Sequence, residues 1–79
     1  MHILFFAYLK NVTGCAETEL QLGPSVDTVR LWRGLLEAYP GLERFRGSVR
    51  LARNCEYVGR GARFADSDEV ALILPVSGG

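Results

Sequence analysis

The apolar segment EVALILPV at residues 69–76 constrains the fold more than any other part of the chain. After Glu69 it carries no charged side chain, and it is rich in branched residues that favour strands. A strand without polar side chains on either face needs cover on both faces, which is typical of a central strand. We therefore expect a sheet in which this segment has a neighbouring strand on each edge.

Four other segments have the composition or the alternation of strands. They are residues 2–9, 17–22, 49–53 and 56–58. Segment 17–22 alternates between polar and apolar side chains, which indicates a strand with one exposed face. We expect it to form a hairpin with segment 2–9 through a turn at residues 11–14. Asn54 and Cys55 separate the last two segments, which predicts a tight connection between them.

One amphipathic helix is predicted between the two pairs of strands. Its apolar stripe has helical spacing and consists of Val29, Trp32, Leu35, Leu36 and Tyr39. Asp27 or Thr28 can cap its first turn, and Pro40 and Gly41 end it. The order of elements is therefore β-β-α-β-β-β, with one main helix packed on one face of a mixed sheet. This order predicts an α+β fold of the β-grasp (ubiquitin-like) type, in a single domain over residues 1–79.

Composition and charge exclude several classes of function. Nine basic and nine acidic residues cancel, so we expect no general electrostatic binding to nucleic acid or to an anionic membrane. The first residues lack the basic leader of a secretory signal, and no apolar stretch is long enough to span a bilayer. We expect a cytoplasmic protein, in whose reducing surroundings Cys15 and Cys55 are free thiols.

Few side chains in this sequence support catalysis. His2 is the only histidine, and the two cysteines have neither the spacing of a zinc site nor an obvious base to activate them. The acidic group Asp66, Asp68 and Glu69 lacks the pattern of an EF-hand loop, which favours a polar turn over a calcium site. We expect no metal, no stably bound cofactor and no enzymatic activity of the chain on its own.

Arginines gather in the second half of the chain. They are Arg44, Arg46, Arg50, Arg53, Arg60 and Arg63. Such a group is usually a solvated face, and the alternative is a docking surface for an acidic partner. The sequence leaves both interpretations open.

Gly78 and Gly79 follow the last predicted strand. Glycine loses much backbone freedom on ordering and has no side chain to pack, so the pair is a poor anchor. Two glycines do suit a flexible tail, residues 76–79, that enters a narrow channel in another protein. A carboxylate at such an end can be joined to AMP and then converted to a thiocarboxylate, whose sulfur is a better nucleophile. Gly79 is therefore the candidate reacting residue, and Gly78 allows the tail to thread.

With these features together, the chain resembles the MoaD family, the small sulfur-carrying subunits of molybdopterin synthase. Three segments are similar to that family's opening strand, helix and hairpin: LFFAYLKNVTG, DTVRLWRGLLEAYPGL and NCEYV. The ending DSDEVALILPVSGG is the most specific. Ser67, Leu74 and Arg53 depart from the family's usual residues, and none of them touches the Gly-Gly end.

The resemblance implies a set of partners. A ubiquitin-activating-like adenylyltransferase would consume ATP to adenylate Gly79, and a sulfur donor such as a cysteine desulfurase or rhodanese would supply the sulfur. The tail would then enter the large subunit of molybdopterin synthase and donate sulfur to cyclic pyranopterin monophosphate, in molybdenum cofactor biosynthesis. The family works as a heterotetramer of two small and two large subunits, in which the catalytic side chains belong to the large subunit.

Strand alternation leaves one apolar face of the sheet without a helix. If Ile3, Phe5, Ala7 and Leu9 face the helix, this open face receives Leu4, Phe6, Tyr8, Ala71 and Ile73, with Tyr57 beside them. An exposed apolar patch of this kind is typical of a partner surface. The expected contacts of the large subunit are Phe6, Tyr57 and Ile73 on this face, and Pro75, Val76 and Ser77 leading to the tail.

Other functions share the fold and the Gly-Gly end. They include sulfur carriers for thiamine, tRNA thiolation or cysteine synthesis, a ubiquitin-like modifier joined to lysines through Gly79, and an interaction domain whose tail has no role. The full-length helix and the ending PVSGG favour the molybdopterin type.

Overall fold

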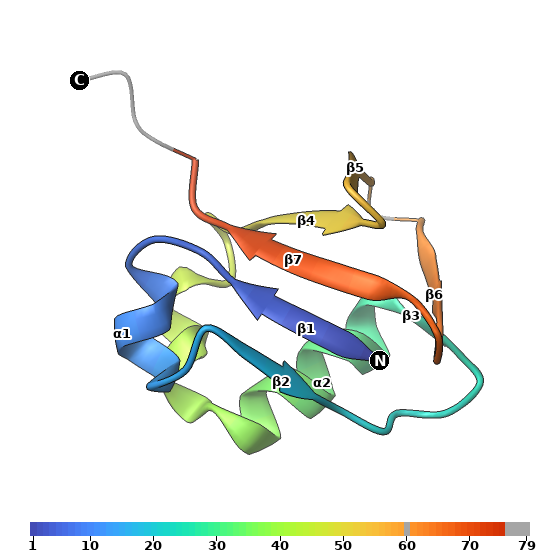
Figure 1. The fold of residues 1–79 in the computed structure, drawn as a ribbon, viewed down its shortest axis with the longest axis horizontal. Coiled ribbons are helices and arrows are strands. Elements are labelled where there is room, and N and C mark those ends of the chain that lie inside the picture. The colour runs from blue at the N-terminus through green and yellow to red at the C-terminus, as the bar shows by residue number, and fades with distance from the viewer. Residues whose placement is uncertain (60, 76–79) are drawn as a thin grey trace.

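A mixed sheet with one main helix across it forms the body of the protein (Figure 1). The computed structural model describes residues 1–59 and 61–75. Its elements are β1 (His2–Phe5), α1 (Leu9–Thr13), β2 (Glu17–Glu19), β3 (Ser25–Asp27), α2 (Thr28–Ala38), the 3₁₀ helix η1 (Pro40–Phe45), β4 (Arg50–Arg53), β5 (Glu56–Tyr57), β6 (Arg63–Ala65) and β7 (Glu69–Ile73). No helix in these two ranges is long and apolar enough to cross a membrane.

The five strands predicted from sequence form one sheet, in the order β2-β1-β7-β4-β5. Strand β7 is central, because β1 pairs with it in parallel and β4 pairs with it antiparallel. The predicted tight connection between β4 and β5 is also present, and Asn54 and Cys55 adopt positive φ angles of 51° and 73° there. The mixed sheet and its central strand are thus confirmed.

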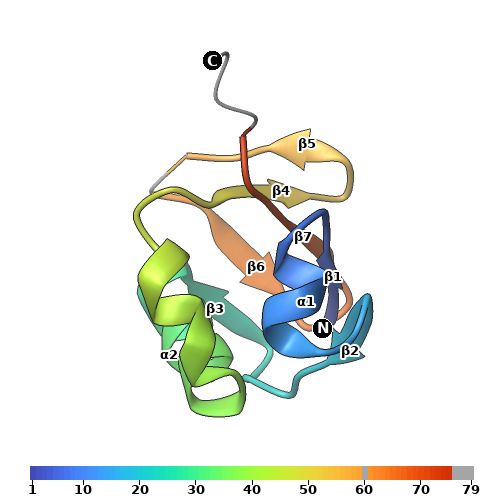
Figure 2. The same cartoon turned by 90° about the vertical axis from the view of Figure 1, so that its left-hand side faces the viewer.

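A second, two-stranded ribbon was not predicted. Strands β3 and β6 pair antiparallel beside α2, with Val26 opposite Phe64 (Figure 2). Each strand has three residues and a single buried apolar residue in its middle. Alternation over so short a span is not detectable, so the sequence indicates only a break at Ser25 and a polar loop around Arg63.

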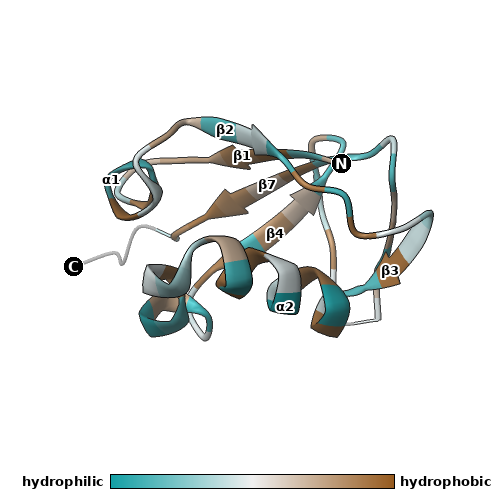
Figure 3. Cartoon of the chain, turned by 90° about the horizontal axis from the view of Figure 1, so that it is seen from below, coloured by the Kyte–Doolittle hydropathy of each residue, from teal (hydrophilic) through white to brown (hydrophobic). Residues whose placement is uncertain are grey.

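The core lies between the sheet and α2. Its fully buried members include Ile3, Phe5, Leu9, Leu31, Leu35, Leu42, Phe64, Val70 and Leu72. Helix α2 covers one face of the sheet only, as the view from below shows (Figure 3). Along β7, Val70 and Leu72 are buried while Glu69, Ala71 and Ile73 are half-buried. The expectation that this strand is buried on both faces was therefore wrong for the second face.

Helix α2 has the predicted start but a rotated apolar face. The Asp27 carboxylate accepts a hydrogen bond of 2.8 Å from the Arg30 N–H, which confirms it as the cap. Leu31 is completely buried, whereas Val29, which was assigned to the stripe, is 57% exposed. The helix packs through Leu31, Trp32 and Leu35, a set that turns the first-turn Val29 away from the sheet.

Gly34 has a packing role within this helix. A Cβ added there would lie 2.4 Å from Leu22 Cδ2, closer than real Cβ contacts. The missing side chain therefore lets Leu22 approach the helix backbone. This contact explains why a glycine stands at position 34, although glycine has a low helix propensity.

Segment 2–9 is not one strand. Strand β1 ends at Phe5, Ala7 adopts a φ of 54°, and α1 follows. Gly14, with a φ of 82°, ends α1 by donating its N–H to the Lys10 carbonyl at 2.8 Å. Ala7 is consequently exposed rather than directed at the helix, and the expected turn over residues 11–14 is mostly helix.

Removal of the α2 cap should destabilise the protein measurably. We expect Asp27→Ala to lower the free energy of unfolding by about 1 kcal/mol, because it leaves a first-turn N–H without its partner. Asp27→Asn, which keeps a side-chain acceptor, should retain most of that stability. Urea unfolding followed by circular dichroism measures both, and equal losses in the two variants would contradict a capping role.

Candidate docking face

The strand register brings one row of side chains to the open face of the sheet. Leu4 pairs with Ala71, Ala71 with Ala52, and Ala52 with Tyr57, so the row crosses β1, β7, β4 and β5. Residues directly opposite each other in neighbouring strands lie on the same face. The row therefore places two alanines between the larger Leu4 and Tyr57.

A hollow of about 210 Å³ lies along this row. It is lined by Leu4, Phe6, Ala52, Cys55, Tyr57, Glu69, Ala71 and Ile73. The surface is depressed because Ala52 and Ala71 are short while their neighbours are long. Phe6 is 46% exposed and Tyr57 is 62% exposed, so large apolar side chains at this hollow remain open to solvent. We call these eight residues the docking face.

The residues predicted for partner binding lie in three different places relative to the hollow and the described chain. The structure brings Phe6, Tyr57 and Ile73 to the same hollow. Pro75 is exposed shortly after the end of β7. The remaining predicted site residues, Val76, Ser77, Gly78 and Gly79, lie outside the described residues.

Tyr8 does not belong to this face, contrary to expectation. The backbone turns at Ala7, and the Tyr8 ring lies edge-on to Phe45 of η1, with centroids 5.7 Å apart. Ala52, Cys55 and Glu69 line the face without having been predicted there. Alternation from the buried Leu51 is the signal that identifies Ala52.

A cation stands at one end of the docking face. The Arg50 guanidinium lies over the Tyr57 ring, 5.1 Å from its centroid, and Arg50 is the register partner of Ile73. A cation over an aromatic ring is attracted by the negative potential of the ring face. The apolar hollow thus has a positively charged edge near the end of β7.

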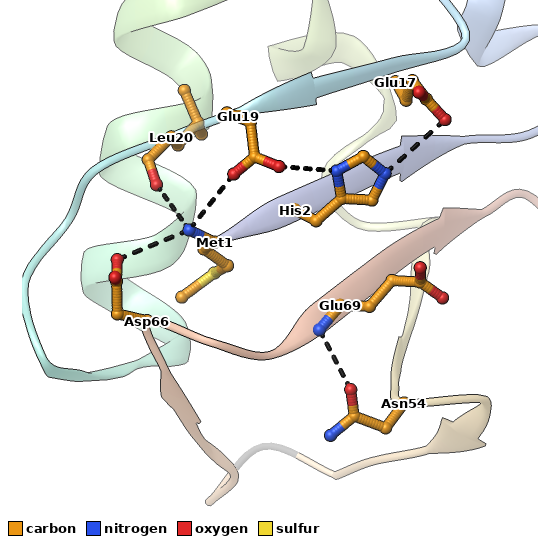
Figure 4. A network of polar contacts seen from close by, with 8 residues as sticks. All are labelled: Met1, His2, Glu17, Glu19, Leu20, Asn54, Asp66 and Glu69. Carbon is orange, nitrogen blue, oxygen red and sulfur yellow. Dashed lines mark hydrogen bonds and ion pairs between the residues drawn. The ribbon is translucent and has the colours of Figure 1, made fainter.

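The other end of β1 carries a histidine held between two carboxylates (Figure 4). His2 Nδ1 lies 2.7 Å from Glu19 Oε1, and Nε2 lies 3.5 Å from Glu17 Oε2. The hydrogen bond to Glu19 is the main cause that raises the pKa of His2 above its usual 6.5, with the Glu17 charge adding to it. The same bond lowers the pKa of Glu19.

The amino group of Met1 joins the same network. It donates to the Leu20 carbonyl at 2.9 Å, and it lies 3.4 Å from Asp66 Oδ1 and 3.6 Å from Glu19 Oε2. These contacts connect the start of β1 to β2 and to the turn before β7.

Asn54 links that turn to the β4–β5 connection. Its amide donates to Asp68 Oδ1 at 3.1 Å, and its Oδ1 accepts from the Glu69 N–H at 3.0 Å. The pKa of Asp68 is lowered, first by the hydrogen bond from the Ala65 N–H and then by Asn54. This arrangement agrees with the polar-turn interpretation of the acidic group. Among residues 1–59 and 61–75, no group of three or more His, Cys, Asp or Glu side chains is arranged to hold a metal ion.

Both cysteines are free thiols. Cys15 is half-buried, with its Sγ 3.6 Å from the Tyr39 hydroxyl. Cys55 is exposed and lines the docking face. The sulfur chemistry expected from sequence resides on the Gly79 carboxylate rather than on either thiol.

The chain is similar to one protein family and to relatives of a single description over nearly its full length. The profile of the ThiS family matches residues 3–79. A molybdopterin synthase sulfur carrier subunit from Chlamydomonas reinhardtii is 37% identical over 79 residues, covering 98% of this chain and 95% of the relative. A protein of the same description from Arabidopsis thaliana is 35% identical over 77 residues, covering 98% of this chain and 80% of the relative.

Among solved structures, SAMP1 from Haloferax volcanii superposes with a TM-score of 0.85 at 31% identity. The match covers 100% of this chain and 98% of SAMP1. The α+β, β-grasp fold predicted from sequence is confirmed by this similarity.

The pKa of His2 provides a direct test of the carboxylate pair. A raised pKa means that the protonated ring stabilises the fold, so this contribution is complete below about pH 6.5 and is lost as the pH rises through the folded-state pKa. Because His2 is the only histidine, its ring signals can be followed alone in an NMR titration. Glu19→Gln should lower the pKa of His2 more than Glu17→Gln does. A larger effect of Glu17→Gln, or a wild-type pKa at or below 6.5, would contradict the geometry.

Proposed function

The chain belongs to the ThiS family, and from this we propose that it is the sulfur carrier subunit of a molybdopterin synthase in the cytoplasm. The observation that carries the proposal is the similarity to relatives of that description over nearly the full length of both chains. It confirms the MoaD-family resemblance that the strand, helix and Gly-Gly segments predicted.

In this proposal the reacting group is the carboxylate of Gly79. It attacks the α-phosphate of ATP in a ubiquitin-activating-like adenylyltransferase, and pyrophosphate leaves. A persulfide of the sulfur donor, a cysteine desulfurase or rhodanese, then displaces AMP from the acyl-adenylate. Cleavage of the resulting acyl disulfide by a thiol leaves the thiocarboxylate, whose sulfur is transferred to cyclic pyranopterin monophosphate.

The described side chains have a positioning role in this scheme. Phe6 and Tyr57 offer exposed apolar area next to a hollow, which supports docking of the large subunit on the open face. Strand β7 runs through this face and ends at Ile73, two residues before Pro75, so docking there brings the end of the chain toward the partner. The chain is then a non-catalytic subunit of a heterotetramer, it holds no cofactor of its own, and ATP is consumed by the activating enzyme.

A second candidate function is covalent modification of other proteins through Gly79. The similarity to SAMP1, together with that to a small archaeal modifier protein 1 from Methanosarcina acetivorans at 26% identity, favours it. The two functions share activation of the same carboxylate and differ in the acceptor, which is a pterin in one case and a lysine amine in the other.

Deletion of Gly79, or addition of one alanine after it, tests the proposal. Either change should abolish sulfur transfer to cyclic pyranopterin monophosphate while the unfolding transition stays unchanged, because the reacting carboxylate is displaced and the core is untouched. The double variant Cys15→Ser/Cys55→Ser is the control, and it should retain transfer. Transfer by the Gly79 variants, or its loss in the cysteine variant with the fold intact, would refute the carrier assignment.

Docking on the open face is tested with two neighbouring aromatic residues. Phe6→Asp should weaken binding of the large subunit by about tenfold or more, because a charge replaces an apolar contact near the centre of an interface. Tyr8→Asp is the matched control, since Tyr8 is 56% exposed but does not line the hollow. Calorimetric titration measures both affinities, and similar losses for the two variants would place the interface elsewhere.

A further inference from the structure

The covered side of the sheet carries a second recessed surface, formed by the outward part of α2 with η1 and β4. Two hollows of about 380 and 560 Å³ both have Arg46 in their lining. The first also contains Val29, Arg33 and Leu36, and the second contains Trp32 and Arg50. We call these six residues the arginine groove. Because α2 lies on the opposite side of the sheet from the docking face (Figure 3), most of this groove is separate from that face.

The groove has apolar walls that are open to solvent. Val29 is 57% exposed, although its place in the apolar stripe predicted burial. Leu36 is half-buried, whereas Trp32 is buried and has the Arg46 guanidinium over its ring, 5.9 Å from the centroid. Partly exposed apolar walls give a partner area to bury when it binds.

The arginines of the groove form no ion pair with the acidic residues that the structure describes. In the described part of the chain, the ion pairs all belong to the Met1 amino group and His2. Arg33, Arg46 and Arg50 therefore have no carboxylate of the described residues within ion-pair distance, and among those residues Glu37 is the only acidic one that lines either hollow. An anionic ligand can engage these guanidinium groups without breaking an existing pair, and guanidinium binds carboxylates in bidentate geometry.

The form of the groove favours a peptide over a small phosphorylated ligand. Asp27 already occupies the start of α2 by accepting the Arg30 N–H, so the helix N-terminus carries a negative charge that opposes phosphate binding. Arg33 comes from α2 and Arg46 directly follows η1, and Val29, Trp32 and Leu36 accompany them in the lining of the two hollows. Arg50 lines the second hollow from β4, while its guanidinium lies over Tyr57 at the docking face. We propose that the arginine groove binds an acidic segment of a protein partner, in which carboxylates alternate with apolar residues.

The proposal is independent of the sulfur chemistry, because α2, which carries Val29, Trp32, Arg33 and Leu36, lies across the sheet from the docking face. Of the arginines grouped in the second half of the sequence, Arg46 and Arg50 line this groove, and the proposal assigns these two to a docking surface. Arg50 borders both surfaces through its contact with Tyr57. Arg33 and Arg46 are therefore the residues to change.

The test is an NMR titration of the full chain with an acetylated and amidated eight-residue peptide, in which glutamate alternates with leucine and valine. We expect the largest shifts at the Trp32 indole N–H and at the amides of Val29 and Arg46. Arg33→Glu/Arg46→Glu should weaken binding by about tenfold or more. Lys10→Glu/Arg44→Glu changes the net charge equally outside the groove and should keep the affinity within about twofold.

Several results would overturn the proposal. These are shifts centred on Phe6 and Tyr57, equal weakening by both double variants, or equal binding of a peptide with lysine in place of glutamate. Tighter binding of ATP at the same residues would assign the groove to a nucleotide instead, and shifts that depend on protein concentration alone would assign it to a second copy of the chain. If circular dichroism shows that the charge-reversal variant is unfolded, Arg33→Gln/Arg46→Gln replaces it, with the same expected direction.

Discussion

The pairing of β7 with β1 on one edge and β4 on the other is the constraint on which the rest of the structure depends. In this register Phe5, Leu72 and Leu51 form one row on the core side. The adjacent row, which contains Ala71 and Ala52, forms the docking face. A slip of one residue would exchange the two faces. The same hydrogen-bonded ladder therefore fixes both the hydrophobic core and the surface offered to a partner.

The predictable part of the fold came from period, composition and residue type. Helix α2 and segment 17–22 were predicted from a period, the other main strands from their composition and the turn residues between them, and the Asp27 cap from residue type. The structure differs from the prediction where the conformation of one residue, or pairing between segments far apart in the chain, determines the secondary structure. Ala7 leaves the strand at a positive φ, which the apolar run around it concealed. The pairing of Val26 with Phe64 joins segments far apart in the chain, and strands of three residues carry no usable alternation.

The candidate site likewise has residues that the sequence predicts and residues that only the folded structure brings together. Alternation assigned Phe6 and Ile73 to one face, and the expected hairpin pairing added Tyr57. The strand register brings the three side chains to one hollow. The position of Ala52 between them required the pairing of β4 with β7. The arginine groove could not be located from sequence, because Arg33 and Arg46 meet only when η1 folds back against α2. The chemistry at Gly79 was predicted from residue type and family resemblance, and it lies outside the described residues.

The central claim is that Gly79 carries sulfur as a thiocarboxylate. Its most direct test is the intact mass of the full chain, before and after incubation with the activating enzyme, ATP and a sulfur donor, with fragmentation to locate any change. The account predicts a gain equal to the exchange of one oxygen for one sulfur at Gly79. An unchanged mass, while the same enzymes convert a known carrier, would contradict it.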